Sequence, residues 1–115
     1  MTPKRTITAA QRFGVWKAWN GQCFWCREPV LFQACHIDHV IPLSAVFKPE
    51  DEDQVRERFG LDSSFDFDDY SNWVAAHAHC NQQKPFALLD PSPAFSVYLT
   101  QIESKAQQAK SIAMK

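Results

Sequence analysis

Two residue pairs with the same spacing constrain this chain more than any other feature of its sequence. Cys23 and Cys26 are separated by two residues, and His77 and Cys80 repeat that gap far along the chain. Ligands at this spacing can reach one tetrahedral ion, and three sulfurs with one nitrogen suit zinc. We therefore predict a structural Zn²⁺ site made by these four residues. His79 is the competing fourth ligand, and the matched gap favours His77.

A metal staple suits the size of the chain. Its 115 residues match one domain, and a domain of this size buries only part of its surface. No apolar stretch approaches the roughly 18 residues of a membrane span, and the N-terminal residues lack the apolar core of a secretory signal. We expect a cytoplasmic protein of bacterial or phage origin with no membrane partner, in which cysteines bind metal. The lone Cys35 is expected to pack in the core.

Acidic residues are concentrated in one segment. Residues 49–69 contain nine acidic and two basic side chains, a net charge of −7, whereas the remainder carries +6 and the whole chain −1. The basic remainder could meet phosphates, but charge asymmetry is weak evidence, and on charge alone a solvated surface is the preferred interpretation. The acidic segment could repel phosphates, cover a site or contact a protein partner.

Helix signals stand at both ends of the chain. Thr8 can cap a helix that runs to about Asn20, where Gly21 favours a stop. A second amphipathic helix is predicted over about 94–112, where apolar residues recur at helical spacing. The four tryptophans are expected to pack in the core and beside the cysteine pair rather than stack on bases.

The middle of the chain reads as strands interrupted by a long excursion. Strands are predicted over residues 29–32, 34–41 and 72–76. The excursion from 42 to 71 contains its own short helix, PEDEDQVRERF, because a proline opens it, acids occupy its first turn and arginines lie near its end. A further helix is predicted to begin just after the second metal-ligand pair.

Polar residues that can take part in catalysis or metal binding occur in a fixed order along these predicted elements. They are Asp38 and His39 on a predicted strand, Asn72 at the start of the next strand, and Asn81 with Lys84 at the start of a helix. Together with the upstream cysteine pair, this ordered spacing resembles that of the HNH endonuclease family over about residues 23–84. No single part carries the resemblance, because Asp-His pairs and Asn-x-x-Lys are both common.

The resemblance implies a fold and an activity. The fold is α+β, a single domain over 1–115 with a small ββα-metal core at about 23–90, zinc-binding knuckles, and flanking N- and C-terminal helices. The activity is hydrolysis of phosphodiester bonds in DNA, with double-stranded DNA as the expected partner and one catalytic divalent ion, Mg²⁺ or another such as Mn²⁺ or Ni²⁺. The acidic insertion at 49–69 departs from the family, whose members often carry glycines after the proline.

The resemblance also implies roles for individual residues. His39 would be the general base, Asp38 and Asn81 would hold the catalytic ion, Asn72 would brace the loop and the base, and Lys84 would contact phosphate or backbone. The chemistry fits these roles independently. Histidine has a pKa near neutrality for taking a proton from water, and oxygen ligands suit a hard cation that offsets charge on the phosphate.

Three questions stay open at this level. Neighbours on a strand point to opposite faces, so Asp38 and His39 need a distortion or a strand end to serve one site. His36 shares a face with Asp38 and is either a further ligand of the catalytic ion or a histidine hydrogen-bonded behind it. The whole chain could instead be a non-catalytic zinc module that binds nucleic acid or protein, or a metal hydrolase for a different substrate.

Overall fold

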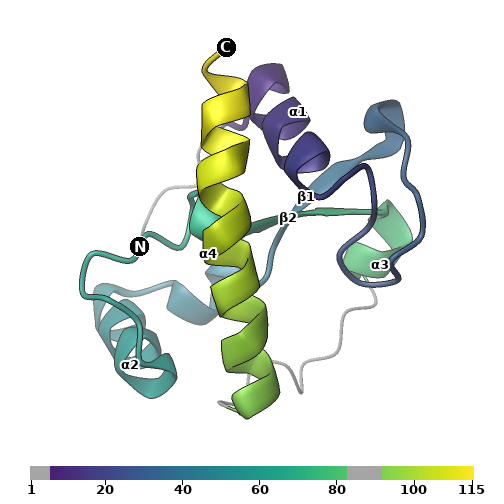
Figure 1. The fold of residues 1–115 in the computed structure, drawn as a ribbon. Coiled ribbons are helices and arrows are strands. Elements are labelled where there is room, and N and C mark those ends of the chain that lie inside the picture. The colour runs from purple at the N-terminus through teal and green to yellow at the C-terminus, as the bar shows by residue number, and fades with distance from the viewer. Residues whose placement is uncertain (1–5, 83–91) are drawn as a thin grey trace.

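The chain folds into a small α+β structure, seen here in a computed structural model that describes residues 6–82 and 92–115. Its helices and strands occur in the order α1 (Ala9–Ala18), β1 (His36–His39), α2 (Pro49–Phe59), β2 (Trp73–Ala76), α3 (Ala78–Gln82) and α4 (Pro93–Ala113). β1 and β2 pair antiparallel, with Asp38 opposite Val74 and His39 opposite Trp73 (Figure 1). The predicted α+β class is confirmed.

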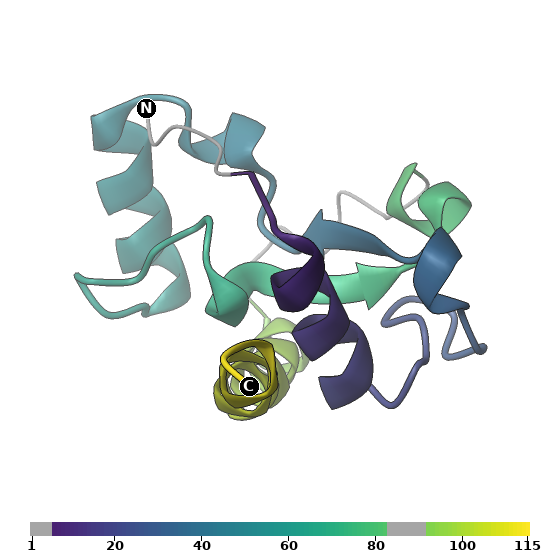
Figure 2. The ribbon, with the colours of Figure 1, turned by 90° about the horizontal axis from the view of Figure 1, so that it is seen from above.

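Helices α1 and α4 pack against each other and cover one face of the two-stranded sheet (Figures 1 and 2). Gly14 of α1 permits this approach, because a Cβ there would lie 2.3 Å from the carbonyl oxygen of Ala109 in α4. Phe95 and Ile102 of α4 are buried in the same core. Helices α2 and α3 lie at opposite ends of the sheet (Figure 2), so the acidic helix stands away from α3.

The helices predicted near both ends of the chain and inside the excursion are confirmed as α1, α2 and α4, and their ends follow the expected capping chemistry. The helix predicted after the second ligand pair begins earlier, at Ala78, and its continuation past Gln82 lies outside the described residues. Thr8 accepts a hydrogen bond from Gln11 N–H, and the Gln11 side chain accepts one from Thr8 N–H, which completes a capping box at the start of α1. Helix α2 begins at Pro49 and ends at Phe59, and the Gly60 that caps it has a left-handed φ of +66°. None of the described helices has both the length and the apolar character needed to cross a membrane.

The strand prediction is only partly correct. Residues 73–76 form β2 as expected, but no strand runs over 29–32, where Pro29 makes one isolated bridge to Gln22 and a 3₁₀ turn follows at Phe32–Ala34. β1 is also shorter than the predicted 34–41. Its hydrogen-bond ladder stops because the amide and carbonyl of Ile41 bond to the side chain of Asn72.

Candidate functional site

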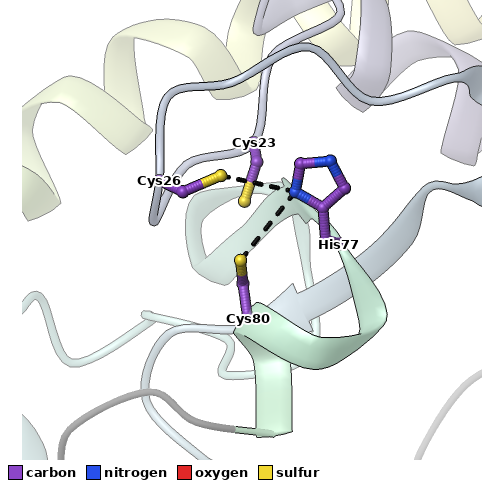
Figure 3. Close-up of side chains that lie close together, drawn as sticks. All are labelled: Cys23, Cys26, His77 and Cys80. Carbon is purple, nitrogen blue, oxygen red and sulfur yellow. Dashed lines mark hydrogen bonds between the residues drawn. The ribbon is translucent and has the colours of Figure 1, made fainter.

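Four ligand side chains converge where the N-terminal knuckle meets the end of β2 and the start of α3 (Figure 3). Cys23 and Cys26 come from the knuckle, and His77 and Cys80 come from the β2–α3 region. Their ligand atoms all lie within 4.8 Å of one another. These four residues are therefore close enough to bind one metal ion, as the spacing predicted.

The donor set and its dimensions fit zinc. The Nδ1 atom of His77 lies 3.4 Å from the sulfur of Cys26 and 3.8 Å from that of Cys80. Around a tetrahedral Zn²⁺ with ordinary bond lengths, a nitrogen and a sulfur ligand are about 3.6 Å apart. Three sulfurs and one imidazole nitrogen also match the ligand preference of zinc over harder cations.

A backbone contact selects His77 as the nitrogen ligand. Its Nε2 lies 3.0 Å from the carbonyl oxygen of Pro29, so Nε2–H donates there and Nδ1 keeps the lone pair that faces the sulfurs. Fixing the second ring nitrogen in this way is usual for metal-bound histidines. His79 stacks on the His77 ring, with centroids 5.1 Å apart, and is not one of the four clustered ligands. Cys35 is buried in the hydrophobic core, as predicted.

The thiols in the cluster differ in how readily they ionise. Burial raises the pKa of Cys23, but backbone hydrogen bonds from neighbouring residues outweigh burial and lower the pKa to about 7. Burial together with the nearby sulfurs of Cys26 and Cys23 raises the pKa of Cys80 to about 12. A divalent cation would relieve this repulsion and favour the thiolate form of each cysteine.

Asp38 of β1 is tied to the same knuckle. Its carboxylate belongs to a residue only 2% exposed, and Trp25 Nε1–H donates to its Oδ2 at 2.6 Å. An aspartate this deeply buried needs such partners, because the ionised form is costly to remove from water. The bond from the Trp25 indole fixes the orientation of this carboxylate relative to the knuckle.

His39 has a different set of partners. Its Nε2 lies 2.6 Å from Oδ1 of Asp68, whose side chain is fully buried. Trp73 on β2 brings its Nε1 to 3.1 Å from the same carboxylate oxygen and 3.2 Å from His39 Nε2. The three side chains form one hydrogen-bonded cluster. Asp38 and His39 therefore contact separate segments, as strand alternation requires.

The side chain of Asn72 joins the two ends of the long segment between β1 and β2, which we call the neck of this segment. Its Oδ1 accepts from Ile41 N–H at 2.8 Å, and its Nδ2 donates to the carbonyls of Ile41 and Phe67 at 2.9 and 2.7 Å. The residue is fully buried, so all three bonds are shielded from water. Asn72 therefore fixes the chain on both sides of the excursion, directly after the strand that carries Asp38 and His39.

The remaining predicted residues are placed less tightly. His36 is exposed at the start of β1, and Asn81 is half-buried in α3, which lies against β1. The backbone amide of Asn81 donates to the carbonyl of His77, which is one of the four clustered metal-ligand residues. Lys84 lies outside the described residues.

A shallow cleft of about 430 Å³ opens along the outer edge of β1. His36 and His39 line it together with Arg12 of α1, and the described lining residues include no acid. Arg12 is held in place because its Nη1 donates to the Phe32 carbonyl at 2.6 Å and its guanidinium lies 4.1 Å from the Phe32 ring centroid. The cleft is therefore a basic surface beside the predicted general base.

Sequence reasoning missed three residues of this site. Asp68 was counted only as one of the insertion's acids, Trp73 only as a packing residue, and Arg12 was given no role. The one local signal was an acid set among aromatic residues in FDFDDY, a pattern unusual for a solvated loop. Contacts across 29 residues of chain leave no periodic trace that could have identified the partner of His39.

Comparisons with known proteins give no assignment for this site. No family model, curated protein or solved structure matches the chain.

Proposed function

We propose that this protein is a metal-dependent endonuclease of the HNH type that hydrolyses phosphodiester bonds in DNA. The observation that supports this most is the Asn72 clasp, which joins the end of β1 to the returning chain through three buried hydrogen bonds. A middle asparagine that braces the loop after the Asp-His strand is what the family pattern requires. The β1–β2–α3 order and the Cys₃His cluster support the same proposal.

In this proposal the residues of β1 have different roles in catalysis. His39 takes the proton from the attacking water, and Asp68, which accepts a hydrogen bond from Trp73, holds its ring. A divalent ion held by Asp38 and Asn81, with His36 as a further candidate ligand, would offset charge on the phosphate and on the leaving oxygen. The zinc cluster serves stability, because it anchors the knuckle from which Trp25 reaches Asp38.

We expect the DNA substrate to bind at the basic cleft. We expect Arg12→Gln to weaken binding of a short DNA duplex about tenfold and to lower the salt slope of binding by about one, because one phosphate contact is lost. Anisotropy titrations without added divalent ion, at several salt concentrations, measure both quantities.

Lys17→Gln is the matched control for this measurement. Lys17 is exposed on the same helix and does not line the cleft, so its loss removes the same charge from a different place. Equal weakening by both variants would mean that net charge, and not the cleft, attracts DNA.

The proposed activity is tested by nicking of supercoiled plasmid with Mg²⁺, Mn²⁺ or Ni²⁺. We expect Asp38→Asn to reduce cleavage about 10²-fold at fixed metal concentration, because the charged ligand of the ion is lost. The amide oxygen of asparagine can still accept the Trp25 hydrogen bond, so the strand keeps its contact to the knuckle.

The zinc content and melting temperature of the Asp38→Asn variant serve as controls for its fold. Plasmid binding without cleavage under any of these ions would contradict the endonuclease and favour a non-catalytic zinc module. Cleavage of simple phosphodiesters but not of plasmid would point to a different substrate.

A further inference from the structure

The acidic insertion turns one of its carboxylates inward. Asp68 belongs to the segment 49–69, where α2 carries exposed acids, yet its own side chain has no exposed surface. Burying a carboxylate without compensation is among the most expensive changes in a protein. Surface charge therefore does not explain the position of Asp68, whereas its hydrogen bonds to His39 and Trp73 do.

The chain that leads into Asp68 is fixed by two hydrogen bonds. Its own backbone N–H donates to Oδ1 of Asp66 at 2.9 Å, and the carbonyl of the preceding residue, Phe67, accepts from Asn72 Nδ2 at 2.7 Å. These hydrogen bonds hold the backbone so that the Asp68 carboxylate stays next to His39. Such bracing is what a group needs if it is to hold another side chain in one orientation.

With Asp68 ionised and His39 neutral, the donors and acceptors of the cluster favour one tautomer of His39. Three atoms meet in the cluster: His39 Nε2, Trp73 Nε1 and Asp68 Oδ1. The indole nitrogen can only donate, and an ionised carboxylate can only accept. Each hydrogen finds an acceptor when both His39 Nε2–H and Trp73 Nε1–H donate to Asp68. In that arrangement the lone pair of the imidazole is on Nδ1.

We propose that Asp68 is a positioning residue that holds His39 in the Nε2–H tautomer and thereby keeps the basic lone pair on Nδ1, with Trp73 orienting the carboxylate. This inference rests on the proposed function, since it assigns a use to His39 as a base. It also gives the insertion a role inside the site. A buried carboxylate that sets the tautomer of a catalytic histidine is a known device in hydrolases with unrelated folds.

The first test measures the tautomer directly. Long-range ¹H–¹⁵N correlation spectra of the zinc-loaded protein distinguish the two imidazole tautomers, and the signal missing from His39→Gln identifies His39 among the four histidines. We expect the Nε2–H form in the wild type and a mixture of tautomers, or the Nδ1–H form, in Asp68→Asn and Asp68→Ala. A wild-type His39 in the Nδ1–H form would overturn the proposal, whether or not the protein cleaves DNA.

The second test separates turnover from binding. We expect Asp68→Asn to lower kcat for plasmid cleavage about 100-fold with KM changed less than about threefold, because the base is misoriented while the DNA surface is intact. Trp73→Phe, which deletes one hydrogen bond and keeps a ring, should lower kcat about fivefold. The matched control is Asp53→Asn in α2, where the side chain is 84% exposed, and it should leave kcat unchanged.

The outcomes distinguish the two claims. A folded Asp68→Asn with wild-type kcat would refute the positioning role while leaving the endonuclease intact. An inactive wild type with His39 in the Nε2–H form would refute the endonuclease while leaving the contact to Asp68. If the Asp68 variants fail to fold, the tautomer in the wild type and kcat in Trp73→Phe still decide the question, and an unchanged kcat in Trp73→Phe would count against the cluster.

Discussion

Replacing Cys23 with alanine is expected to abolish both zinc binding and cooperative unfolding. Cys23 is fully buried, and its sulfur is one of four ligand atoms that join the knuckle to the β2–α3 region. Structural zinc contributes on the order of 10 kcal/mol to the folding of small metal-binding domains, which exceeds the total stability of many single domains. Losing one of four ligands should therefore leave little native protein at room temperature.

Zinc content by mass spectrometry and thermal unfolding by circular dichroism measure the two effects. Cys35→Ala is the matched control, because Cys35 is also buried but lies outside the cluster. It should keep one zinc per chain and lose about 1 kcal/mol through a small cavity. A Cys23→Ala variant that still binds one zinc and melts cooperatively would show that the cluster does not hold the fold together.

Acid should release the metal from the wild type. Protons compete with zinc for the three thiolates and for Nδ1 of His77, so affinity falls as pH falls. The competition is stronger at Cys80 than at Cys23, because burial together with the nearby sulfurs raises the pKa of Cys80 to about 12, whereas the pKa of Cys23 is about 7.

Replacing His39 with alanine is expected to reduce DNA cleavage about 10³-fold, the usual contribution of a positioned general base. The side chain is largely buried, with 11% of its surface exposed at the basic cleft. Binding of the duplex should change little, because Arg12 remains. Single-turnover cleavage of plasmid at saturating protein concentration measures the chemical step apart from binding.

His79→Gln is the control for the His39 variant. His79 is exposed and is neither a clustered zinc ligand nor a lining residue of the cleft. Replacing His39 also removes a hydrogen-bond partner of the buried Asp68 carboxylate. The melting temperature of His39→Gln should therefore be compared with that of His39→Ala. Cleavage that survives in a folded His39→Ala variant at the wild-type rate would remove His39 as the base.

The sequence predicted the parts of this protein that depend on local chemistry. The Cys₃His cluster was predicted correctly because two ligand pairs share one short gap, and α1, α2 and α4 were predicted correctly because capping and apolar spacing are local signals. The strand at 29–32 was wrong for a local reason as well. Arg27 adopts a φ of +64°, and the knuckle turns back on itself with only one bridge, at Pro29.

The contacts that shape the candidate site depend on the tertiary fold. Trp25 was expected to pack, and it does lie against the core, but it also donates a hydrogen bond to Asp38. Asp68 reaches His39 only because the insertion folds back and Asn72 holds its return. No spacing rule contains this information, since the length of an insertion places no limit on which of its residues meets the core.

The neck formed by Asn72 has a consequence for engineering. Ile41 and Phe67 are joined through the side chain of Asn72, so the distance between the two ends of the intervening segment is fixed. Lengthening such a segment costs only closure entropy, which grows slowly with length. Gly60 lies in this segment with open space around it, since a Cβ there would meet nothing within 4 Å, and its left-handed φ of +66° favours keeping the glycine itself. A DNA-binding domain inserted beside Gly60 would give the protein a preference for one DNA sequence. The insertion would leave β1 and β2 unchanged.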